Sequence, residues 1–339
     1  MLRSVMTPHY FCWPCAICAA LGCGGARAER PPPEMWQVVS ENEAAALLSV
    51  SGTSADDVWM VGADDGTGPL VLHGNGVDWV REEVDVRADL WWVQALPGGV
   101  VYLGGSGGSV FERRGGQWLR MQTPELAEAT VFGVWSAGEG DVYAVGSARG
   151  GRGFLWHYDG STWRELALPL GLPLDESANP PSLFKVWGAS ASDVWVVGDR
   201  GVVLRGNALA GFRRIESGSQ QERLFTVHGA GGRVAMVGGS ANGWALEAEG
   251  EQLVLISPPG AAPLQGVCVS ERGDVWAVGV AGNVYARDAG AAAWRDVFTH
   301  HPVQSLHAVW IDPGGGIWAV GGNVLTPELD RGVALHYTR

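Results

Sequence analysis

Hydrophobic residues in this chain come in short blocks that are separated by small and polar residues. In the stretch VWGASASDVWVVGDRG, which runs from Val186 to Gly201, an apolar block, a turn of small residues and Asp, and a second apolar block follow one another directly. Short runs that are apolar at consecutive positions are typical of strands buried on both faces. The pattern therefore predicts β-strands packed between other sheets, and it excludes a solenoid of helices.

The same pattern occurs seven times along the chain. Its copies span residues 48–62, 91–105, 132–146, 184–198, 225–239, 265–279 and 307–321. Trp59 and Trp318 occupy one position in the first and last copies and lie six repeats apart, which gives about 43 residues per repeat, the length of one four-stranded propeller blade. We therefore expect an all-β fold, a seven-bladed β-propeller with four-stranded blades.

The two remaining strands of each blade follow from the residues between the copies. Third strands end at His73, Glu112, His157, Arg205, Glu247, Arg287 and His336. Fourth strands carry Trp79, Trp118, Trp163, Phe212, Leu253 and Trp294, which makes one fewer than the number of copies. The segment 35–39 resembles a fourth strand and precedes the first copy, so the N-terminal strand is expected to close the last blade and remove its open edge.

The repeated turns carry Asp57, Asp141, Asp193 and Asp274 directly before the second strand. Asp and Ser side chains in turns commonly accept hydrogen bonds from neighbouring backbone amides. Because the Asp recurs at one repeat position, we assign it a structural role and not a catalytic or metal-binding one.

Composition agrees with this architecture and limits the partners. The chain has 51 Gly and 17 Trp among 339 residues and a formal net charge of −13. An acidic surface disfavours nucleic acid and anionic lipid as main partners. No cofactor-binding motif occurs, and we expect a monomer without cofactor or metal.

The first residues have the layout of an export signal. Arg3 supplies a positive start, residues 10–21 an apolar run too short to span a bilayer, and Ala20 to Cys23 a small-residue cleavage site ending in cysteine. These last residues resemble a bacterial lipobox, which implies lipidation of Cys23 and, since Gly24 and not Asp follows, the outer membrane. Cleavage by ordinary signal peptidase after Ala26 or Ala28, giving a secreted protein, is the alternative.

The predicted domains are therefore a signal peptide at 1–22, a tether at 23–34 and the propeller at 35–339. Of the five cysteines only Cys268 lies within the propeller. No disulfide framework can form there, and we expect Cys268 to be a buried, unreactive thiol.

Several motifs resemble known propeller repeats. The segment HYDGSTW (157–163) and the Gly-Gly pairs at 104–105, 238–239 and 321–322 resemble Kelch and sialidase-type (BNR) repeats. The tandem VWGASASDVWVVGD is similar to bacterial secreted propellers related to the photosystem II stability/assembly-factor-like group. The resemblance implies fold more than function. The strict Asp box of sialidases is absent from the repeated turns, and no Trp-Asp pair ends the repeat as in WD40 proteins.

Differences among the copies indicate one candidate binding face. The second-to-third strand connections are long at 63–69, 147–152 and 323–331, and the connection between blades is long at 166–182. Both classes of connection open on the same face of a propeller, and function collects on loops held by a rigid scaffold. The speculative ligand-binding residues on this face are Asp64, Asp65, Arg149, Arg152, Glu328 and Arg331.

A second candidate lies on the innermost strands. Lys185, the only lysine of the chain, aligns with mostly small residues in the other copies and with Trp92 in the second. A cation and an indole facing the central channel could receive a carboxylate or a sugar, whereas a snorkelling lysine in a wet channel is the simpler interpretation. A metal cluster of His300, His301 and His307 is disfavoured because no usual ligand spacing accompanies it.

These patterns favour a non-catalytic binding or assembly propeller, anchored by lipid in the cell envelope, that holds an envelope protein, peptide or glycan on its long-loop face. The membrane is contacted through the anchor alone. The alternative is an extracellular carbohydrate-active hydrolase or lyase. Its carboxylates would come from Asp64, Asp65, Asp175 and Glu176, which lie in loops and not on rigid strand ends.

Overall fold

The computed structural model describes residues 35–297 and 305–338, and these form seven antiparallel sheets of four strands each. The predicted seven-bladed β-propeller is confirmed. Blades 1 to 3 consist of β2 (Leu47–Ser54), β3 (Asp57–Asp64), β4 (Pro69–Gly74) and β5 (Trp79–Arg81); β6 (Leu90–Leu96), β7 (Val100–Gly105), β8 (Ser109–Arg114) and β9 (Gln117–Arg120); and β10 (Thr130–Gly138), β11 (Asp141–Ala148), β12 (Arg152–Tyr158) and β13 (Trp163–Glu165).

Blades 4 to 6 continue in the same order. They consist of β14 (Leu183–Ser190), β15 (Asp193–Gly198), β16 (Val203–Asn207) and β17 (Gly211–Ile215); β18 (Leu224–Ala230), β19 (Arg233–Gly238), β20 (Trp244–Glu249) and β21 (Gln252–Leu255); and β22 (Leu264–Val269), β23 (Val275–Gly279), β24 (Val284–Arg287) and β25 (Arg295–Asp296). The only helical elements in the described part of the chain are two 3₁₀ turns, η1 (Arg149–Gly151) and η2 (Asp199–Gly201).

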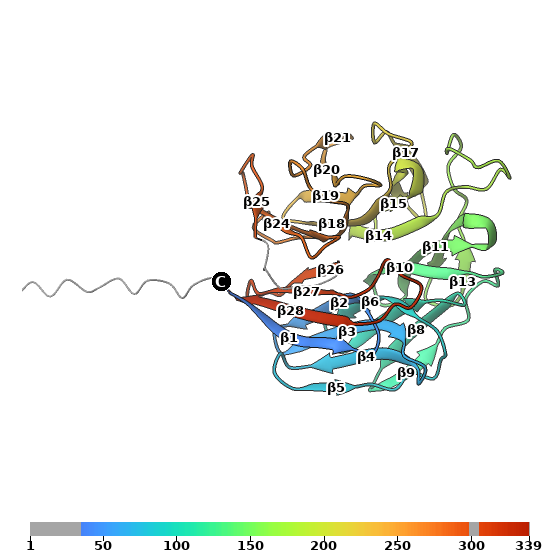
Figure 1. Cartoon of the computed structure of the whole chain (residues 1–339). Coiled ribbons are helices and arrows are strands. Elements are labelled where there is room, and N and C mark those ends of the chain that lie inside the picture. The colour runs from blue at the N-terminus through green and yellow to red at the C-terminus, as the bar shows by residue number, and fades with distance from the viewer. Residues whose placement is uncertain (1–34, 298–304, 339) are drawn as a thin grey trace, which may run out of the picture. The chain divides into compact units, whose positions relative to one another are not determined.

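Blade 7 is built from both ends of the chain. Its strands are β26 (Leu306–Ile311), β27 (Ile317–Gly321), β28 (Gly332–Thr338) and, on the outside, β1 (Met35–Glu43). Trp36 pairs with Tyr337 in the ladder, and their ring centroids lie 5.2 Å apart. Figure 1 shows the blue N-terminal strand beside the red C-terminal one, so the predicted closure is confirmed.

The hydrophobic core lies between neighbouring blades. Strand β15 is buried at five consecutive positions, because each face of its sheet packs against another blade. The cluster around Trp135 and Val145 of blade 3 continues into Val186 and Val196 of blade 4. Trp195 of β15 and Trp276 of β23, which align across the copies, are each 1% exposed. The second-strand Trp therefore fills the wedge between blades.

The Asp residues of the repeated turns do more than the sequence suggested. Asp57 accepts from the His73 ring at 2.9 Å and from Trp59 Nε1 at 3.2 Å. Asp141 likewise binds His157 at 2.7 Å, and Asp193 binds Arg205 at 2.6 Å. Asp274 does accept from a backbone amide, but the amide is that of Ala289 in the third-to-fourth turn and not a neighbour in its own turn. In three blades the Asp instead ties the second strand to the third through a side chain, a structural role of a different kind.

Strand direction gives the propeller two distinct faces. Because successive strands are antiparallel, the first-to-second and third-to-fourth turns lie on one face, here named the short-turn face. The second-to-third connections and the connections between blades lie on the other, the long-loop face. Within the described residues, no helix is long and apolar enough to cross a membrane.

Candidate functional site

One position on the innermost strands joins each blade to the next. The residues at this position, named the clasp residues, are Ser51, Gln94, Trp135, Trp187, His228, Cys268 and Trp310. They lie at the channel end that faces the short turns. Each contacts the following blade, and the contact takes one of two forms.

In the first form a tryptophan ring covers a glycine. A Cβ atom on Gly188 would lie 2.5 Å from the Trp135 ring, and one on Gly229 would lie 2.6 Å from the Trp187 ring. Gly52 is covered in the same way by Trp310 of blade 7. These glycines are needed for close approach of the ring, since any side chain would overlap it.

In the second form a smaller side chain accepts a backbone hydrogen bond. Ser51 Oγ accepts from the Ala95 amide at 3.1 Å, and Gln94 Oε1 accepts from the Ser136 amide at 2.8 Å. His228 Nδ1 accepts from the Val269 amide at 3.1 Å. This bond requires Nδ1 to be unprotonated, and burial lowers the pKa of His228 to about 4. Neutral His228 is therefore part of the clasp.

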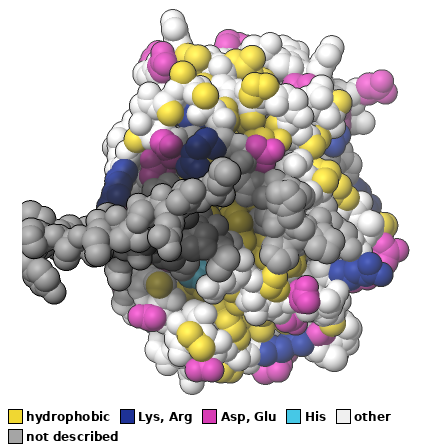
Figure 2. Space-filling model, turned by 60° about the vertical axis from the view of Figure 1, so that its left-hand side comes forward, with side chains coloured by type: hydrophobic (Ala, Val, Ile, Leu, Met, Phe, Trp, Pro, Cys, Tyr) yellow, Lys and Arg dark blue, Asp and Glu magenta, His cyan; other side chains and the backbone are white. Residues whose placement is uncertain are grey.

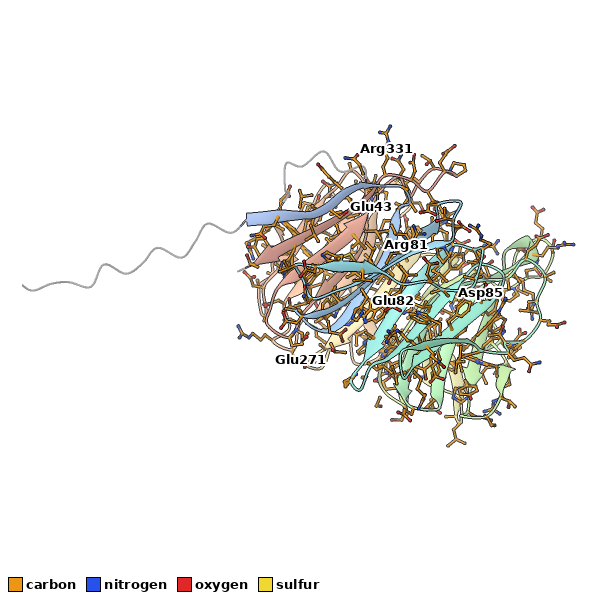
Figure 3. The ribbon with its side chains drawn as sticks, turned by 90° about the horizontal axis from the view of Figure 1, so that it is seen from below. Glu43, Arg81, Glu82, Asp85, Glu271 and Arg331 are labelled. Atoms are coloured by element: carbon orange, nitrogen blue, oxygen red, sulfur yellow. The ribbon has the colours of Figure 1, made fainter. Side chains whose placement is uncertain are left out.

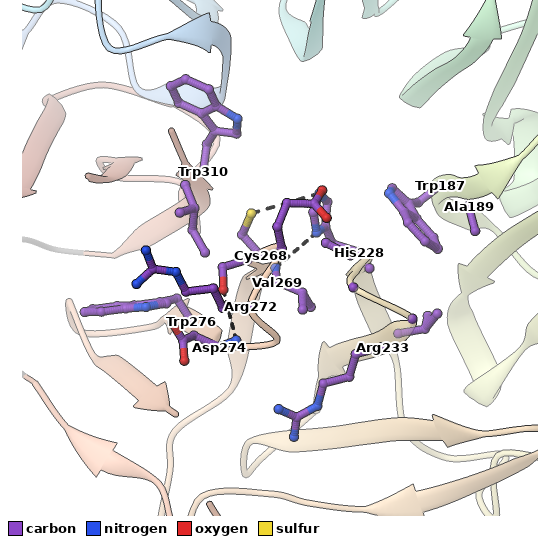
Figure 4. Close-up of a pocket in the computed structure, with 18 of the residues that line it drawn as sticks. Trp187, Ala189, His228, Arg233, Cys268, Val269, Arg272, Asp274, Trp276 and Trp310 are labelled. Carbon is purple, nitrogen blue, oxygen red and sulfur yellow. Dashed lines mark hydrogen bonds between the residues drawn. The ribbon is translucent and has the colours of Figure 1, made fainter. Parts of the chain in front are cut away.

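The order of the two forms around the ring opens a cleft. His228 and Cys268 stand between Trp187 and Trp310, and around them a cleft of about 980 Å³ crosses the short turns of blades 4 to 7. Figure 4 shows Trp187 and Trp310 on opposite sides of His228 and Cys268. Two smaller side chains between two indoles thus leave a volume at the upper end of the range of small-molecule sites.

The charged groups of this short-turn cleft are largely paired with one another. Arg205 binds both oxygens of Asp193 and lies 4.6 Å from the Trp195 ring centroid. Arg233 binds Glu247 and the Gly273 carbonyl. Exposed charges at the margin come from Glu271 and Arg272. The cleft therefore offers indole surfaces, glycine-rich backbone and a mixed margin of charge.

Lys185 and Trp92 do come together, as the sequence suggested. Lys185 is 5% exposed, and its Nζ lies 3.7 Å from the Trp92 ring centroid and donates to the Phe132 carbonyl at 3.0 Å. Both residues line a chamber of about 190 Å³ inside the channel. Burial lowers the pKa of Lys185 to about 7. The chamber adjoins the short-turn cleft, because both are lined by Trp187, His228, Cys268 and Trp310.

Aromatic rings from four blades lie around the end of the channel that faces away from the short turns. Trp91, Phe132, Phe184 and Phe225 follow one another around four blades, with ring centroids 5.4, 5.8 and 5.5 Å apart. None of the four lines the chamber. This rim was not predicted from the sequence, although the aromatic residue recurs one position before the Lys185 position in four consecutive copies.

Several predicted residues of the long-loop face pair with charges nearby. Asp65 accepts from Arg81 at 2.7 Å, and the Arg81 and Thr67 hydrogen bonds hold the pKa of Asp65 well below its usual range. Asp64 accepts from the amides of Gly66 and Gly68 and so closes its own loop. Both carboxylates are therefore largely occupied, Asp64 by amides of its own loop and Asp65 by Thr67 of that loop and Arg81 of β5.

The predicted arginines of blade 3 behave similarly. Arg149 binds Glu128 at 2.7 Å, and Arg152 binds Glu165 at 2.5 Å. Glu328 and Arg331 are exposed, and Arg331 points outward at the edge of the molecule in Figure 3, far from Glu271. On the face shown in Figure 2, acidic and basic side chains lie next to each other at several places around the outside, and hydrophobic side chains are visible both there and nearer the centre.

The other sequence-based candidates have simpler outcomes. Cys268 is 3% exposed and burial raises the pKa of its thiol to about 12, which agrees with an unreactive residue. His307 Nδ1 bonds the Leu48 carbonyl, and His300 and His301 lie outside the described residues. Within 35–297 and 305–338, no group of three His, Cys, Asp or Glu could hold a metal ion. Cys23, the signal segment and the tether also lie outside the described residues.

The fold and this channel define a seven-bladed β-propeller with a cleft on its short-turn face. No family model matches the sequence, and no curated protein matches it. Among solved structures, it is similar to YCF48 bound to D1 peptide, with 14% identity, a TM-score of 0.66 and coverage of 90% of this chain and 97% of that one. YCF48 from Cyanidioschyzon merolae has 16% identity and a TM-score of 0.66 over 89% and 98% of the two chains.

An enzyme has the same architecture. Catalytically inactive virginiamycin B lyase from Staphylococcus aureus with quinupristin has 11% identity and a TM-score of 0.69, over 88% of this chain and 99% of that one. At such identities the likeness shows the fold alone. A peptide-bound propeller and a lyase therefore share this scaffold.

Proposed function

We propose that this protein is a non-catalytic binding propeller that holds an extended segment of a protein partner in the short-turn cleft. The observation that carries the proposal is the cleft itself, which crosses four blades and is bordered by Trp187 and Trp310. Indoles supply large contact areas at low entropic cost. Binding of a D1 peptide by the similar propeller YCF48 supports a peptide partner.

The chemistry of the cleft favours a polypeptide over a uniformly charged ligand. Arg205 and Arg233 are already paired with Asp193 and Glu247, the second of which also binds Arg287, so their donors are largely occupied. What is left for a ligand is apolar surface, backbone groups of the short turns and one exposed charge of each sign. A peptide, which combines apolar side chains with amide donors and acceptors, matches that surface.

Matched double variants on the two faces test the location. Peptides are selected with the purified full chain from a random display library, and their affinity is measured by calorimetry. Glu271→Ala with Arg272→Ala removes the exposed charges of the cleft, whereas Glu328→Ala with Arg331→Ala removes an equal pair from the long-loop face. We expect the first variant to bind the peptides at least tenfold more weakly than the wild type, and the second to change their affinity by less than twofold.

The opposite result would place the interface on the long-loop face, as the sequence analysis suggested. Wild-type peptide affinity in both variants would reject both locations. Cleavage of any member of a glycan panel by the purified chain would replace the binding role with the carbohydrate-active alternative.

We also propose that the propeller is exported and held in the outer membrane by lipid on Cys23. The support is the sequence alone, through the lipobox resemblance of residues 20–23. Labelling with a palmitate analogue should disappear in Cys23→Ala and persist in Cys18→Ala. Labelling that persists in Cys23→Ala contradicts the anchor and favours the secreted alternative.

A further inference from the structure

The chamber in the channel contains a buried cation whose surroundings supply no counter-charge. Lys185 reaches from β14 toward blades 2 and 3, where Gly133 leaves room for it: a Cβ atom there would lie 3.3 Å from Lys185 Cδ. The ammonium has three donors. One donates to the Phe132 carbonyl and another faces the Trp92 ring, which leaves a donor for a ligand.

The chamber lining holds no Asp or Glu among its described residues. Its other titratable groups are His228, His307 and Cys268. Burial lowers the pKa of both histidines to about 4 and raises that of Cys268 to about 12. Lys185 is therefore the single group of the described lining whose charge changes between about pH 5 and pH 9, in a chain whose net charge is −13.

We propose that the chamber is a receptor for a carboxylate, which binds Lys185 Nζ while the group attached to it packs against Trp92 and the apolar walls. Burying an unpaired ammonium is costly, and an entering carboxylate removes that cost by forming a charge-assisted hydrogen bond. The volume of about 190 Å³ equals roughly six water molecules of the bulk liquid, which suits a small acid or the last residue of a peptide.

Two sources can supply this carboxylate, a free small acid or the C-terminus of a peptide lying in the adjoining cleft. The second source rests on the proposed function, and the first does not. The chamber and cleft share Trp187 and His228 in their linings, so a chain end can pass from one to the other. One experiment, with a free acid in one arm and peptides in the other, distinguishes the two sources.

The uniqueness of Lys185 makes the test direct. Lysine labelled with ¹³C at Cε gives a single side-chain signal, and its pH titration reports on Lys185 alone. We expect a midpoint near 7 in the free protein and a rise of at least one pH unit with 3-phenylpropanoate. The neutral isostere 3-phenylpropanamide should leave the midpoint unchanged.

The peptide arm uses the peptides selected on the cleft, each with a free or an amidated C-terminus. A rise with free C-termini alone identifies the peptide as the source, and a rise with 3-phenylpropanoate alone identifies a free acid. No rise in either arm overturns the carboxylate receptor. Peptide affinity that is unchanged in the Glu271→Ala and Arg272→Ala variant, while 3-phenylpropanoate still raises the midpoint, shows that the chamber stands although the proposed function fails.

Two further measurements distinguish a receptor from a structural lysine. Lys185→Met should weaken 3-phenylpropanoate binding at least tenfold while the circular dichroism spectrum stays unchanged, and Arg149→Met, which removes a surface cation, should have no effect. The charged fraction of Lys185 falls from about half at pH 7 to about one in a hundred at pH 9, so affinity should fall about fiftyfold. Equal binding by the wild type and Lys185→Met overturns the proposal.

Discussion

The two faces of this propeller differ in where their polar groups find partners. On the long-loop face, Arg149 pairs with Glu128 of a neighbouring connection, and Asp65 pairs with Arg81 at the end of β5. On the short-turn face the connections are brief, and a cleft of about 980 Å³ opens beside His228. Long loops here largely satisfy their own polar groups, whereas short turns leave the ends of the strands accessible.

The difference shows what creates a hollow in a ring of similar blades. Each clasp residue either covers a glycine with an indole or accepts a backbone hydrogen bond, and both forms hold the blades together. Only the second form uses side chains smaller than an indole. His228 and Cys268 occupy two consecutive clasp positions between Trp187 and Trp310, and the space that indoles would fill at these positions forms the cleft. Side-chain size at one repeated position, and not loop length, sets its location.

The largest expected effect is on the tryptophan form of the clasp. Gly188→Ala places a Cβ atom against the Trp135 ring, and we expect a loss of about 3 kcal/mol in the free energy of unfolding, measured in urea. Trp135→Leu in the same chain removes the overlap. If Gly188→Ala costs as much in the Trp135→Leu background as in the wild type, ring overlap is not the cause.

The hydrogen-bonded form of the clasp should respond to pH. The folded pKa of His228 lies near 4 and its ordinary value near 6.5, so stability is complete above pH 6.5 and is lost as the pH falls toward 4. We expect a loss on the order of 2 kcal/mol from His228, followed by chemical denaturation at several pH values. His228→Asn, which keeps an acceptor for Val269, should reduce the slope of the profile and leave the part that comes from His307, whose pKa is lowered in the same way.

The long-loop face supplies the contrast for that measurement. The lowered pKa of Asp65 gives stability that is present above its ordinary value of 3.8 and is lost only at lower pH. Asp65→Asn should therefore leave the profile between pH 6.5 and 4 unchanged. If stability depends less on pH in Asp65→Asn than in His228→Asn, the pH response comes from the long-loop face and not from the clasp.

Lys185 should reduce stability in the absence of ligand. Its folded pKa is about 7 and its ordinary value 10.5, so the wild type gains stability as the pH rises from 7 to 10.5. Lys185→Met should raise the free energy of unfolding by about 1 kcal/mol at pH 7, measured in urea, and the gain should vanish near pH 10.5. A gain that stays constant with pH would indicate better packing by Met and not removal of a buried charge.

The smallest effect is expected on the long-loop face. Arg149 and Glu128 are both exposed, and such pairs contribute little. Arg149→Ala should change the free energy of unfolding by less than about 0.5 kcal/mol. A double-mutant cycle with Glu128→Ala measures the pair itself, and a coupling above about 1 kcal/mol would show that this loop is held more tightly than exposure suggests.

Much of this structure could be read from the repeats. Aligning the copies placed the strands, and counting fourth strands identified the closure by Trp36, because each blade needs the same set of strands to cover its neighbours. The partnership of Lys185 and Trp92 also followed from their shared position. The pairing of Asp57 with His73 did not, since it joins strands whose register is fixed only by the folded sheet.

The cleft was missed although a signal was present. At the clasp position the seven copies carry Ser, Gln, Trp, Trp, His, Cys and Trp. Wherever this residue is Trp, the next blade has a glycine directly after its own clasp residue. Comparing side-chain volumes at that position, in place of loop lengths, would have located the gap. Loop length was the less informative quantity because inserted residues bring polar groups that bind one another.

The sequence by itself determined the number of blades, the order of the strands and the joining of the two chain ends, because these follow from periodicity and from the need to bury both faces of every sheet. Only the tertiary structure decided which side chains meet across blades. Closing the ring brings Lys185 to Trp92 and places His228 between two indoles, and such contacts depend on curvature and packing that no single repeat contains.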